Sequence, residues 1–158
     1  MLFAGLMLTE SGPKVLEFNC RFGDPETQSI LPRLEGDLLG ALAATAAGDL
    51  EGVEVASSDD AAVTVVMAAG GYPERSDTGT TIEGVDDAEA AGAFVFHAGT
   101  ALHGDRLVTN GGRILAVTGT GATVAAARQQ AYAGCDAIQF DGAHYRRDIA
   151  QVAVGAAD

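Results

Sequence analysis

Turn-forming residues divide this chain into short segments, and this division limits the folds open to it. Clusters of Gly, Pro, Asn and Asp interrupt the apolar runs at residues 9–13, 23–25, 70–73, 104–105 and 110–112. Such clusters are typical of turns, because Gly tolerates positive φ and Pro fixes φ. Short segments between frequent turns predict an α+β fold with small, mostly antiparallel sheets.

Several of these segments have the patterns of strands. Residues 2–8 and 14–19 are largely apolar and lie on either side of the first turn, which predicts a β-hairpin. Residues 62–69 form an apolar run that is typical of a buried strand. Further short strands are expected around 80–83, 93–97, 106–109 and 113–118. The turn Asn110-Gly111-Gly112 predicts that the last two strands pair as a second hairpin.

Two helices are expected in the first third of the chain. Residues 26–34 predict a short helix that breaks near Pro32, because proline disrupts a helix interior. Residues 36–47 predict a second helix that begins near Asp37 and ends at Gly48.

One long helix and one domain boundary complete the predicted organisation. Residues 122–138 are Ala-rich and amphipathic. The expected buried side of this helix consists of Val124, Ala127, Ala131 and Ile138. The segment 51–60 is short and acidic and contains a Ser-Ser pair, so we expect it to separate two domains, 1–50 and 60–158.

The charge of the chain restricts its partners. It carries 22 acidic against 9 basic residues, and its formal net charge is -13. Such a surface repels nucleic acid and anionic membranes, so we expect neither as a partner. A solvated acidic face and adaptation to high cytoplasmic salt both explain the acidity. The sequence has neither a membrane-length apolar run nor a signal-peptide pattern, and its two cysteines indicate reduced thiols, so we expect a cytoplasmic protein.

The end of the second expected strand carries the residues best suited to chemistry. Glu17 and Asn19 are two residues apart, so in a strand they point to the same face. They can offer two oxygen ligands to Mg²⁺, which commonly takes one or two protein ligands plus phosphate oxygens. Arg21 continues the alternation and can bring positive charge to a neighbouring anion. Two alternatives stay open: an edge strand whose polar residues face water, and an ion pair of Arg21 with Asp24 or Glu26.

Residues 16–28, LEFNCRFGDPETQ, resemble the signature of the phosphoribosylamine–glycine ligases, also called glycinamide ribonucleotide synthetases, of the ATP-grasp superfamily. Other segments are similar to consecutive blocks of the same family, in the same order, from about Phe3 to Ile149. These segments are AGLMLTESGPKVLEFN, ILPRL, AAGGYP, VFHAGTAL, VTNGGRILAVTGTG and FDGAHYRRDI. Several ordered blocks are more specific than any single motif.

The resemblance implies a ligase that joins glycine to 5-phosphoribosylamine in de novo purine synthesis. In the family, ATP phosphorylates the glycine carboxylate, and the amine then attacks the glycyl phosphate to give glycinamide ribonucleotide. By this resemblance Glu17 and Asn19 bind Mg²⁺ or Mn²⁺, and ATP is a co-substrate. Arg21 is the catalytic residue that stabilises the transferring phosphoryl group or the acyl phosphate.

The resemblance implies a second site in the Asn-Gly-Gly-Arg segment. In similar purine-pathway ligases a Gly-Arg strand at this place approaches the ribose phosphate, so Gly111, Gly112 and Arg113 are expected to bind substrate. A plain hairpin turn is the alternative. In the C-terminal tail, we expect Asp148 to pair with an arginine and clamp the chain end rather than to leave an anion site.

The family carries an amino-terminal domain and most of an ATP-grasp domain ahead of the region matched here. The implied fold is the last hairpin and helix of an ATP-grasp domain, residues 1–50, followed by a small β-barrel-like closing domain, residues 60–158. We expect the isolated chain to be inactive, to bind ATP poorly, and to self-associate unless the missing parts cover its strand edge. The alternatives are a non-catalytic ribose-phosphate-binding module, a complementing part of a split enzyme, and a degenerate product.

Overall fold

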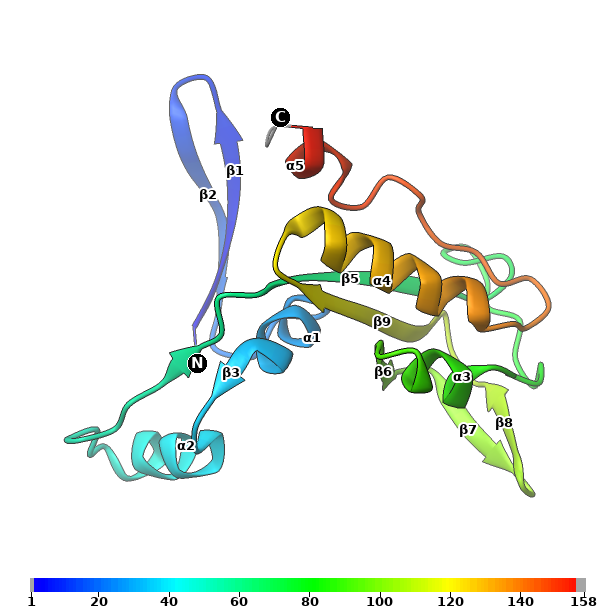
Figure 1. Ribbon diagram of the computed structural model, residues 1–158, viewed down its shortest axis with the longest axis horizontal. Coiled ribbons are helices and arrows are strands. Elements are labelled where there is room, and N and C mark those ends of the chain that lie inside the picture. The colour runs from blue at the N-terminus through cyan, green and yellow to red at the C-terminus, as the bar shows by residue number, and fades with distance from the viewer. Residues whose placement is uncertain (1, 156–158) are drawn as a thin grey trace.

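The computed structural model describes residues 2–155 as an α+β arrangement of short antiparallel sheets and helices, which confirms the predicted class (Figure 1). The strands are β1 (Phe3–Thr9), β2 (Gly12–Asn19), β3 (Leu34–Glu35), β4 (Ala56–Ser57), β5 (Ala61–Ala68), β6 (Phe94–His97), β7 (Thr100–His103), β8 (Arg106–Thr109) and β9 (Arg113–Gly121). The helices are α1 (Glu26–Ile30), a 3-10 turn (Leu31–Arg33), α2 (Leu38–Ala47), α3 (Val85–Ala90), α4 (Val124–Ala137) and α5 (Gln151–Gly155). No helix in the described residues has the length and hydropathy needed to cross a bilayer.

The first two strands form the predicted hairpin. β1 and β2 pair antiparallel from Phe3 opposite Asn19 to Thr9 opposite Gly12, with an irregularity after Gly5. The hairpin extends away from the remaining elements (Figure 1). Its apolar side chains are exposed on both faces, namely Leu6, Met7, Leu8, Val15, Leu16 and Phe18.

Local signals set the ends of the two helices that follow. α1 continues into the 3-10 turn that contains Pro32, as predicted. The carboxylate of Asp37 accepts a hydrogen bond from the amide of Gly40 at 2.8 Å and caps the start of α2. Gly48, with φ of 74°, ends α2 in the left-handed conformation that glycine tolerates best. The expected boundary segment contains β4, which pairs with β3.

The core lies between helix α4 and the three-stranded sheet β5-β9-β6. β9 is central and pairs antiparallel with both neighbours. Val65 of β5 lies opposite Val117 of β9, and both are fully buried. The predicted buried positions Ala127, Ala131 and Ile138 of the helical segment are confirmed, and Val124 is partly buried against the core. One amphipathic helix therefore closes one face of this sheet.

The predicted hairpin at Asn110–Gly112 is wrong. β8 pairs with β7, whereas β9 pairs with β5 and β6. The amide of Gly99 donates to the carbonyl of Arg113 at 2.8 Å, so the chain leaving β6 occupies the edge of β9 that β8 was expected to take. A turn signal reports a local reversal of the chain, but the pairing of strands depends on which faces can be buried.

The barrel-like description is also not supported. The described strands form four separate antiparallel sheets, and none of them closes on itself. Residues 80–83 make only isolated bridges, at Thr81 and Glu83, where a strand was expected. Helix α3 and strand β7 were not predicted. α3 packs against α4 with Ala88 fully buried, which is a tertiary contact that its short sequence, VDDAEA, does not signal.

The two cysteines are expected to differ in reactivity. Cys135 lies on the buried side of α4, and burial raises the pKa of its thiol to about 12, whereas Cys20 is exposed. Because the thiolate is the reactive form, iodoacetamide at mildly alkaline pH should alkylate Cys20 and spare Cys135. Mass spectrometry of the native and urea-unfolded chains measures this, and both thiols should react after unfolding. Alkylation of native Cys135 at the rate of Cys20 would contradict it.

The same buried thiol should make stability depend on alkaline pH. The pKa of Cys135 in the folded chain lies above its ordinary value of 9.0, so folding favours the protonated thiol. Its contribution is complete below about pH 9 and is lost as the pH rises toward 12. Urea unfolding across this range should show a smaller loss of stability for Cys135→Ala than for the unmodified chain.

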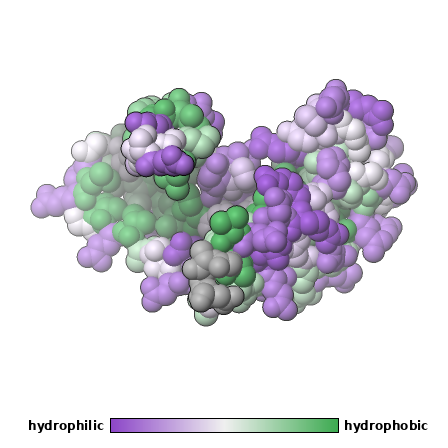
Figure 2. Space-filling view, turned by 90° about the horizontal axis from the view of Figure 1, so that it is seen from above, coloured by the Kyte–Doolittle hydropathy of each residue, from purple (hydrophilic) through white to green (hydrophobic). Residues whose placement is uncertain are grey.

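The exposed hairpin is expected to drive self-association. Hydrophobic surface covers much of the half of the molecule that carries the hairpin and α2, whereas the other half is largely hydrophilic (Figure 2). Exposed strand edges and apolar patches favour association. Replacing Leu8 and Leu16 with lysine should shift the chain toward monomer in analytical ultracentrifugation. Leu102→Lys on β7 is the matched control, because Leu102 is 75% exposed outside this surface. A monomeric unmodified chain at high concentration would contradict the expectation.

Candidate functional site

The two expected metal ligands lie side by side along β2. Glu17 pairs with Gly5 and Asn19 with Phe3 across the hairpin. A Cβ on Gly5 would lie 3.2 Å from Cγ of Glu17, so the small residue on β1 leaves room for the Glu17 side chain. Glu17 is exposed and Asn19 is half-buried. The strand geometry therefore puts both side chains on one face, as predicted from their spacing.

The chemistry of this pair fits a hard cation. The amide nitrogen of Asn19 is buried and has no hydrogen-bond partner among the described residues, and Glu17 forms no salt bridge with them. The unpartnered nitrogen of Asn19 is a hydrogen-bond donor, so only the Asn19 amide oxygen and the Glu17 carboxylate could bind a cation. Within residues 2–155 there is no group of three or more His, Cys, Asp or Glu that could hold a metal. The pair can supply two ligands and no complete metal site.

Arg21 lies just beyond the end of β2 on an exposed turn. Its Nη1 donates to the carbonyl of Phe22 at 2.9 Å, and its guanidinium carbon lies 5.9 Å from the centre of the Phe3 ring. The alternative ion pair with Asp24 or Glu26 does not form among the described residues. The guanidinium therefore remains available to an anion near the Glu17–Asn19 face.

The structure joins the two site regions that the sequence placed apart. Nη2 of Arg113 lies 3.0 Å from Oδ2 of Asp24, and its Nη1 donates to the Asp24 carbonyl at 3.4 Å. Nε2 of Gln28 donates to the other carboxylate oxygen of Asp24 at 3.0 Å. Arg113 and Asp24 are 89 positions apart in the sequence, so no local signal could have paired them.

Gly111 and Gly112 lie where the backbone passes close to other groups. A Cβ on Gly112 would come within 2.4 Å of the Tyr72 ring, and one on Gly111 would lie 3.0 Å from Cα of Gly99. The carbonyl of Gly112 accepts from the amide of Ala69 at 2.8 Å. Close packing explains why both positions are glycine. None of the described hydrogen bonds uses the amide of Gly111 or Gly112.

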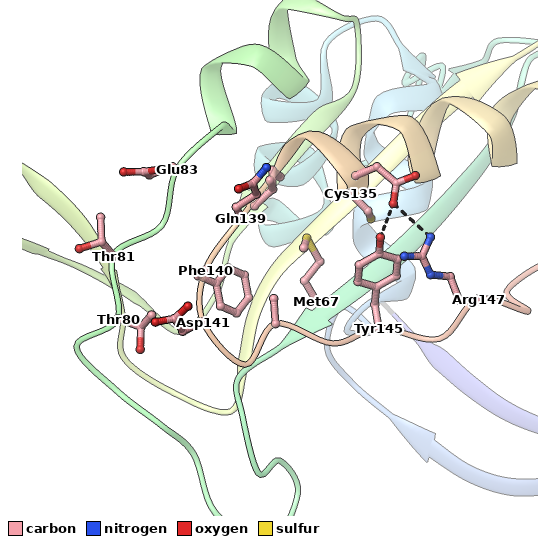
Figure 3. A pocket seen from close by; sticks show the side chains of 13 residues that line it. Met67, Thr80, Thr81, Glu83, Cys135, Gln139, Phe140, Asp141, Tyr145 and Arg147 are labelled. Atoms are coloured by element: carbon pink, nitrogen blue, oxygen red, sulfur yellow. Dashed lines mark hydrogen bonds and ion pairs between the residues drawn. The ribbon is translucent and has the colours of Figure 1, made fainter.

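A second polar cluster, which sequence reasoning missed, lies in a cavity of about 770 Å³ beside the C-terminal end of α4 (Figure 3). Asp136 accepts a hydrogen bond from Tyr145 at 2.5 Å and pairs with Arg147 at 3.1 Å. Burial, followed by the bond to Asp136, raises the pKa of the Tyr145 hydroxyl. The only sequence signal for this cluster was the charged run Arg146-Arg147-Asp148, which includes one of its members.

The polar contacts of the tail fasten it to α4. Arg146 pairs with Asp148 at 2.8 Å, which confirms the predicted pairing of Asp148 with an arginine. The Tyr132 hydroxyl donates to the Arg146 carbonyl at 2.7 Å, and Arg128 donates to the Ile149 carbonyl at 2.9 Å. The geometry assigns this region a structural role, holding the chain end against the core helix.

Comparison with known families gives two matches. Residues 62–152 match the phosphoribosylglycinamide synthetase C domain, and residues 1–27 match the phosphoribosylglycinamide synthetase ATP-grasp (A) domain. The hairpin with its signature turn and the α4-covered sheet thus correspond to two named domains of one kind of protein. Both family models describe phosphoribosylglycinamide synthetase, one its ATP-grasp (A) domain and the other its C domain.

The relatives agree with this class. A phosphoribosylamine–glycine ligase of Mesorhizobium japonicum is 51% identical over 154 residues, which cover 98% of this chain and 36% of that protein. The trifunctional purine biosynthetic protein adenosine-3 of Homo sapiens is 50% identical over 94% of this chain and 15% of its own length. The crystal structure of phosphoribosylamine–glycine ligase from Thermotoga maritima matches with a TM-score of 0.80 and 38% identity, covering 94% of this chain and 36% of that chain.

This chain belongs to the phosphoribosylglycinamide synthetase family, as its signature and ordered blocks predicted. It spans about a third, 36%, of the length of the Mesorhizobium relative that it matches.

Proposed function

We propose that this chain forms the C-terminal part of a ligase that joins glycine to 5-phosphoribosylamine with consumption of ATP. The observation that carries the proposal is the 51% identity to a phosphoribosylamine–glycine ligase across 98% of the chain. The signature segment supports it, because Glu17 and Asn19 lie at the end of β2 and Arg21, on the turn that follows, forms no salt bridge with the described residues. The product is glycinamide ribonucleotide, formed through a glycyl phosphate.

Within this ligase Glu17 and Asn19 would hold Mg²⁺ or Mn²⁺ with their side-chain oxygens. A bound divalent ion neutralises charge on the phosphates of ATP. Arg21 would place its guanidinium beside the phosphoryl group as it moves to the glycine carboxylate. Fixed positive charge at that place lowers the energy of the developing negative charge.

The segment Gly111–Arg113 would meet the ribose phosphate of the amine substrate. Two unused backbone amides beside an arginine form a suitable cradle for a phosphate. The Arg113 side chain is 44% exposed, so one edge of its guanidinium faces Asp24 while the rest remains accessible. The same features favour a second candidate function, a non-catalytic module that binds a ribose phosphate.

The partner implied is the remainder of the ATP-grasp enzyme. Residues 1–27 match the ATP-grasp (A) domain of the family, and the hairpin exposes apolar residues on both faces. Burial of that surface by the preceding part of the enzyme would remove it from water. Because a partial ATP site lacks most of its ligands, the chain alone is expected to show no micromolar affinity for magnesium-ATP in isothermal titration.

Complementation tests the proposed function. This chain is mixed with the portion of the Mesorhizobium ligase that precedes the matched region, and the mixture is called the assembled ligase here. We expect glycinamide ribonucleotide and ADP to form from glycine, ATP and phosphoribosylamine only when both parts are present. Each part alone is the control. A stable complex without turnover, together with binding of ribose 5-phosphate by this chain, would favour the non-catalytic module instead.

A further inference from the structure

The sheet β5-β9-β6 has a second covered face, away from α4. Residues that alternate with the Val65–Val117 pair point to that side, and Thr64 lies opposite Thr118 there. Thr118 is fully buried, and helix α1 contacts both β5 and β9 (Figure 1). The short helix that follows the signature turn therefore docks on the C-domain sheet, and the Thr64–Thr118 pair forms part of this contact.

The hydroxyls at this contact form a chain with a fixed direction. Thr118 Oγ1 lies 3.0 Å from the carbonyl oxygen of Gln28. Because a carbonyl oxygen can only accept, Thr118 donates its single hydroxyl proton to this bond. Thr64 must then donate to Thr118 across 2.7 Å, and Ser29 must donate to Thr64 across 2.6 Å. The chain starts and ends on adjacent residues of α1. It satisfies every hydroxyl on the way, and such buried networks strengthen cooperatively.

A second contact fastens the turn itself. Asp24 receives Arg113 of β9 on one carboxylate oxygen and Gln28 of α1 on the other, both at 3.0 Å. Arg113 and Thr118 belong to the same strand, so β9 holds the signature region at two points. The first point is the turn at Asp24, and the second is the carbonyl of Gln28.

We propose that Asp24, Thr64 and Thr118 are positioning residues that lock the signature turn onto the C-domain sheet and so set where Arg21 and the Glu17–Asn19 pair face that domain. This inference rests on the proposed function for its catalytic consequence. Neither Asp24 nor the two threonines contacts the predicted metal face, so they act through the turn. Because β9 also carries Arg113, one strand would align the phosphoryl-transfer side and the ribose-phosphate side of the reaction.

Amide hydrogen exchange on this chain tests the lock without any need for activity. Thr118→Val leaves the Gln28 carbonyl without its donor, and Asp24→Asn removes the charge that pairs with Arg113. Each should lower protection of the amides of residues 21–30 roughly tenfold while α4 keeps its protection. Thr118→Ser retains the hydroxyl and should restore protection. Thr120→Val is the matched control, because Thr120 lies on the same strand but is not part of the hydrogen-bonded hydroxyl series. It should leave the amide protection of residues 21–30 unchanged.

Ser29→Ala is a milder variant for the case in which Thr118→Val unfolds the chain, because it removes only the first donor of the series, at a half-buried position. It should loosen residues 21–30 less than Thr118→Val. Unchanged hydrogen exchange of residues 21–30 in both Asp24→Asn and Thr118→Val would contradict the proposal that these residues hold the signature turn on the sheet. Equal loosening of residues 21–30 and α4 would also overturn it, since that pattern marks general destabilisation.

Kinetics of the assembled ligase then separate positioning from substrate binding. Asp24→Asn should lower kcat roughly tenfold with little change in KM for ATP or glycine, because a misplaced turn slows the reaction after binding. An unchanged kcat with a loosened turn would overturn the catalytic consequence. Absence of turnover in the unmodified assembly would count against the proposed function. Hydrogen exchange would still test whether Asp24, Thr64 and Thr118 hold the signature turn on the sheet.

Discussion

Replacing Gly119 with alanine is expected to lower the free energy of unfolding by about 3 kcal/mol or more. Gly119 lies on β9 directly beneath α4, and a Cβ there would come within 2.3 Å of the Ala127 carbonyl oxygen and 2.4 Å of the Ala131 amide nitrogen. Both atoms are helix backbone, which cannot turn aside as a side chain can. The whole helix would have to lift from the sheet, and such a loss is a large part of the roughly 5–15 kcal/mol that stabilises a typical domain.

Urea unfolding followed by circular dichroism measures this effect. Gly121→Ala is the matched control on the same strand, because its Cβ would lie 3.0 Å from the Ala126 side chain and 3.2 Å from the Ala127 amide nitrogen. We expect Gly121→Ala to cost clearly less than Gly119→Ala. An unfolding free energy for Gly119→Ala within about 0.5 kcal/mol of the unmodified chain would show that α4 does not approach β9 this closely.

Glu17→Gln should lower kcat/KM of the assembled ligase by at least roughly a hundredfold. Mutation of a residue that only hydrogen-bonds a metal ligand typically lowers metal affinity or activity about 10–100-fold. Loss of a charged ligand should lower activity at least as much. Glu17 is exposed in this chain and forms no described salt bridge, so the fold should be unaffected. The expected result is a loss of activity together with an increased requirement for Mg²⁺.

Steady-state kinetics over a range of magnesium concentrations checks this result. Glu10→Gln is the matched control, since Glu10 is an exposed glutamate in the turn of the same hairpin. It should leave kcat/KM and the magnesium requirement unchanged. Equal kinetics for Glu17→Gln and Glu10→Gln would contradict the assignment of Glu17 as a metal ligand, provided that both variants show the melting temperature of the unmodified chain.

The elements that could be predicted from sequence are those with local causes. Asp37 caps α2 and Gly48 ends it, and both residues act on amides and dihedrals within one turn of the helix. The buried side of α4 follows from a spacing of three to four residues, and Ala127 and Ala131 occupy it as expected. Period, cap and turn chemistry need no knowledge of distant residues.

In the candidate site, too, some features have local causes and others depend on contacts between distant residues. Glu17 and Asn19 lie on one face because strand residues alternate, which the sequence alone implies. The pairing of Arg113 with Asp24 and the contact of Thr118 with Gln28 join residues about ninety positions apart. Their alignment depends on α1 docking across β5 and β9, and no local pattern encodes that docking.

The amino-acid sequence was enough to predict the family, the hairpin that carries Glu17 and Asn19, and the long helix that covers the core. The tertiary structure was needed to show that β9 pairs with β5 and β6 instead of β8, that none of the described sheets closes into a barrel, and that the signature turn contacts the sheet β5-β9-β6. Short-range signals select turns and faces through dihedral preferences and periodicity. The choice between competing strand partners depends on burial and on satisfied hydrogen bonds, and these exist only once distant segments meet.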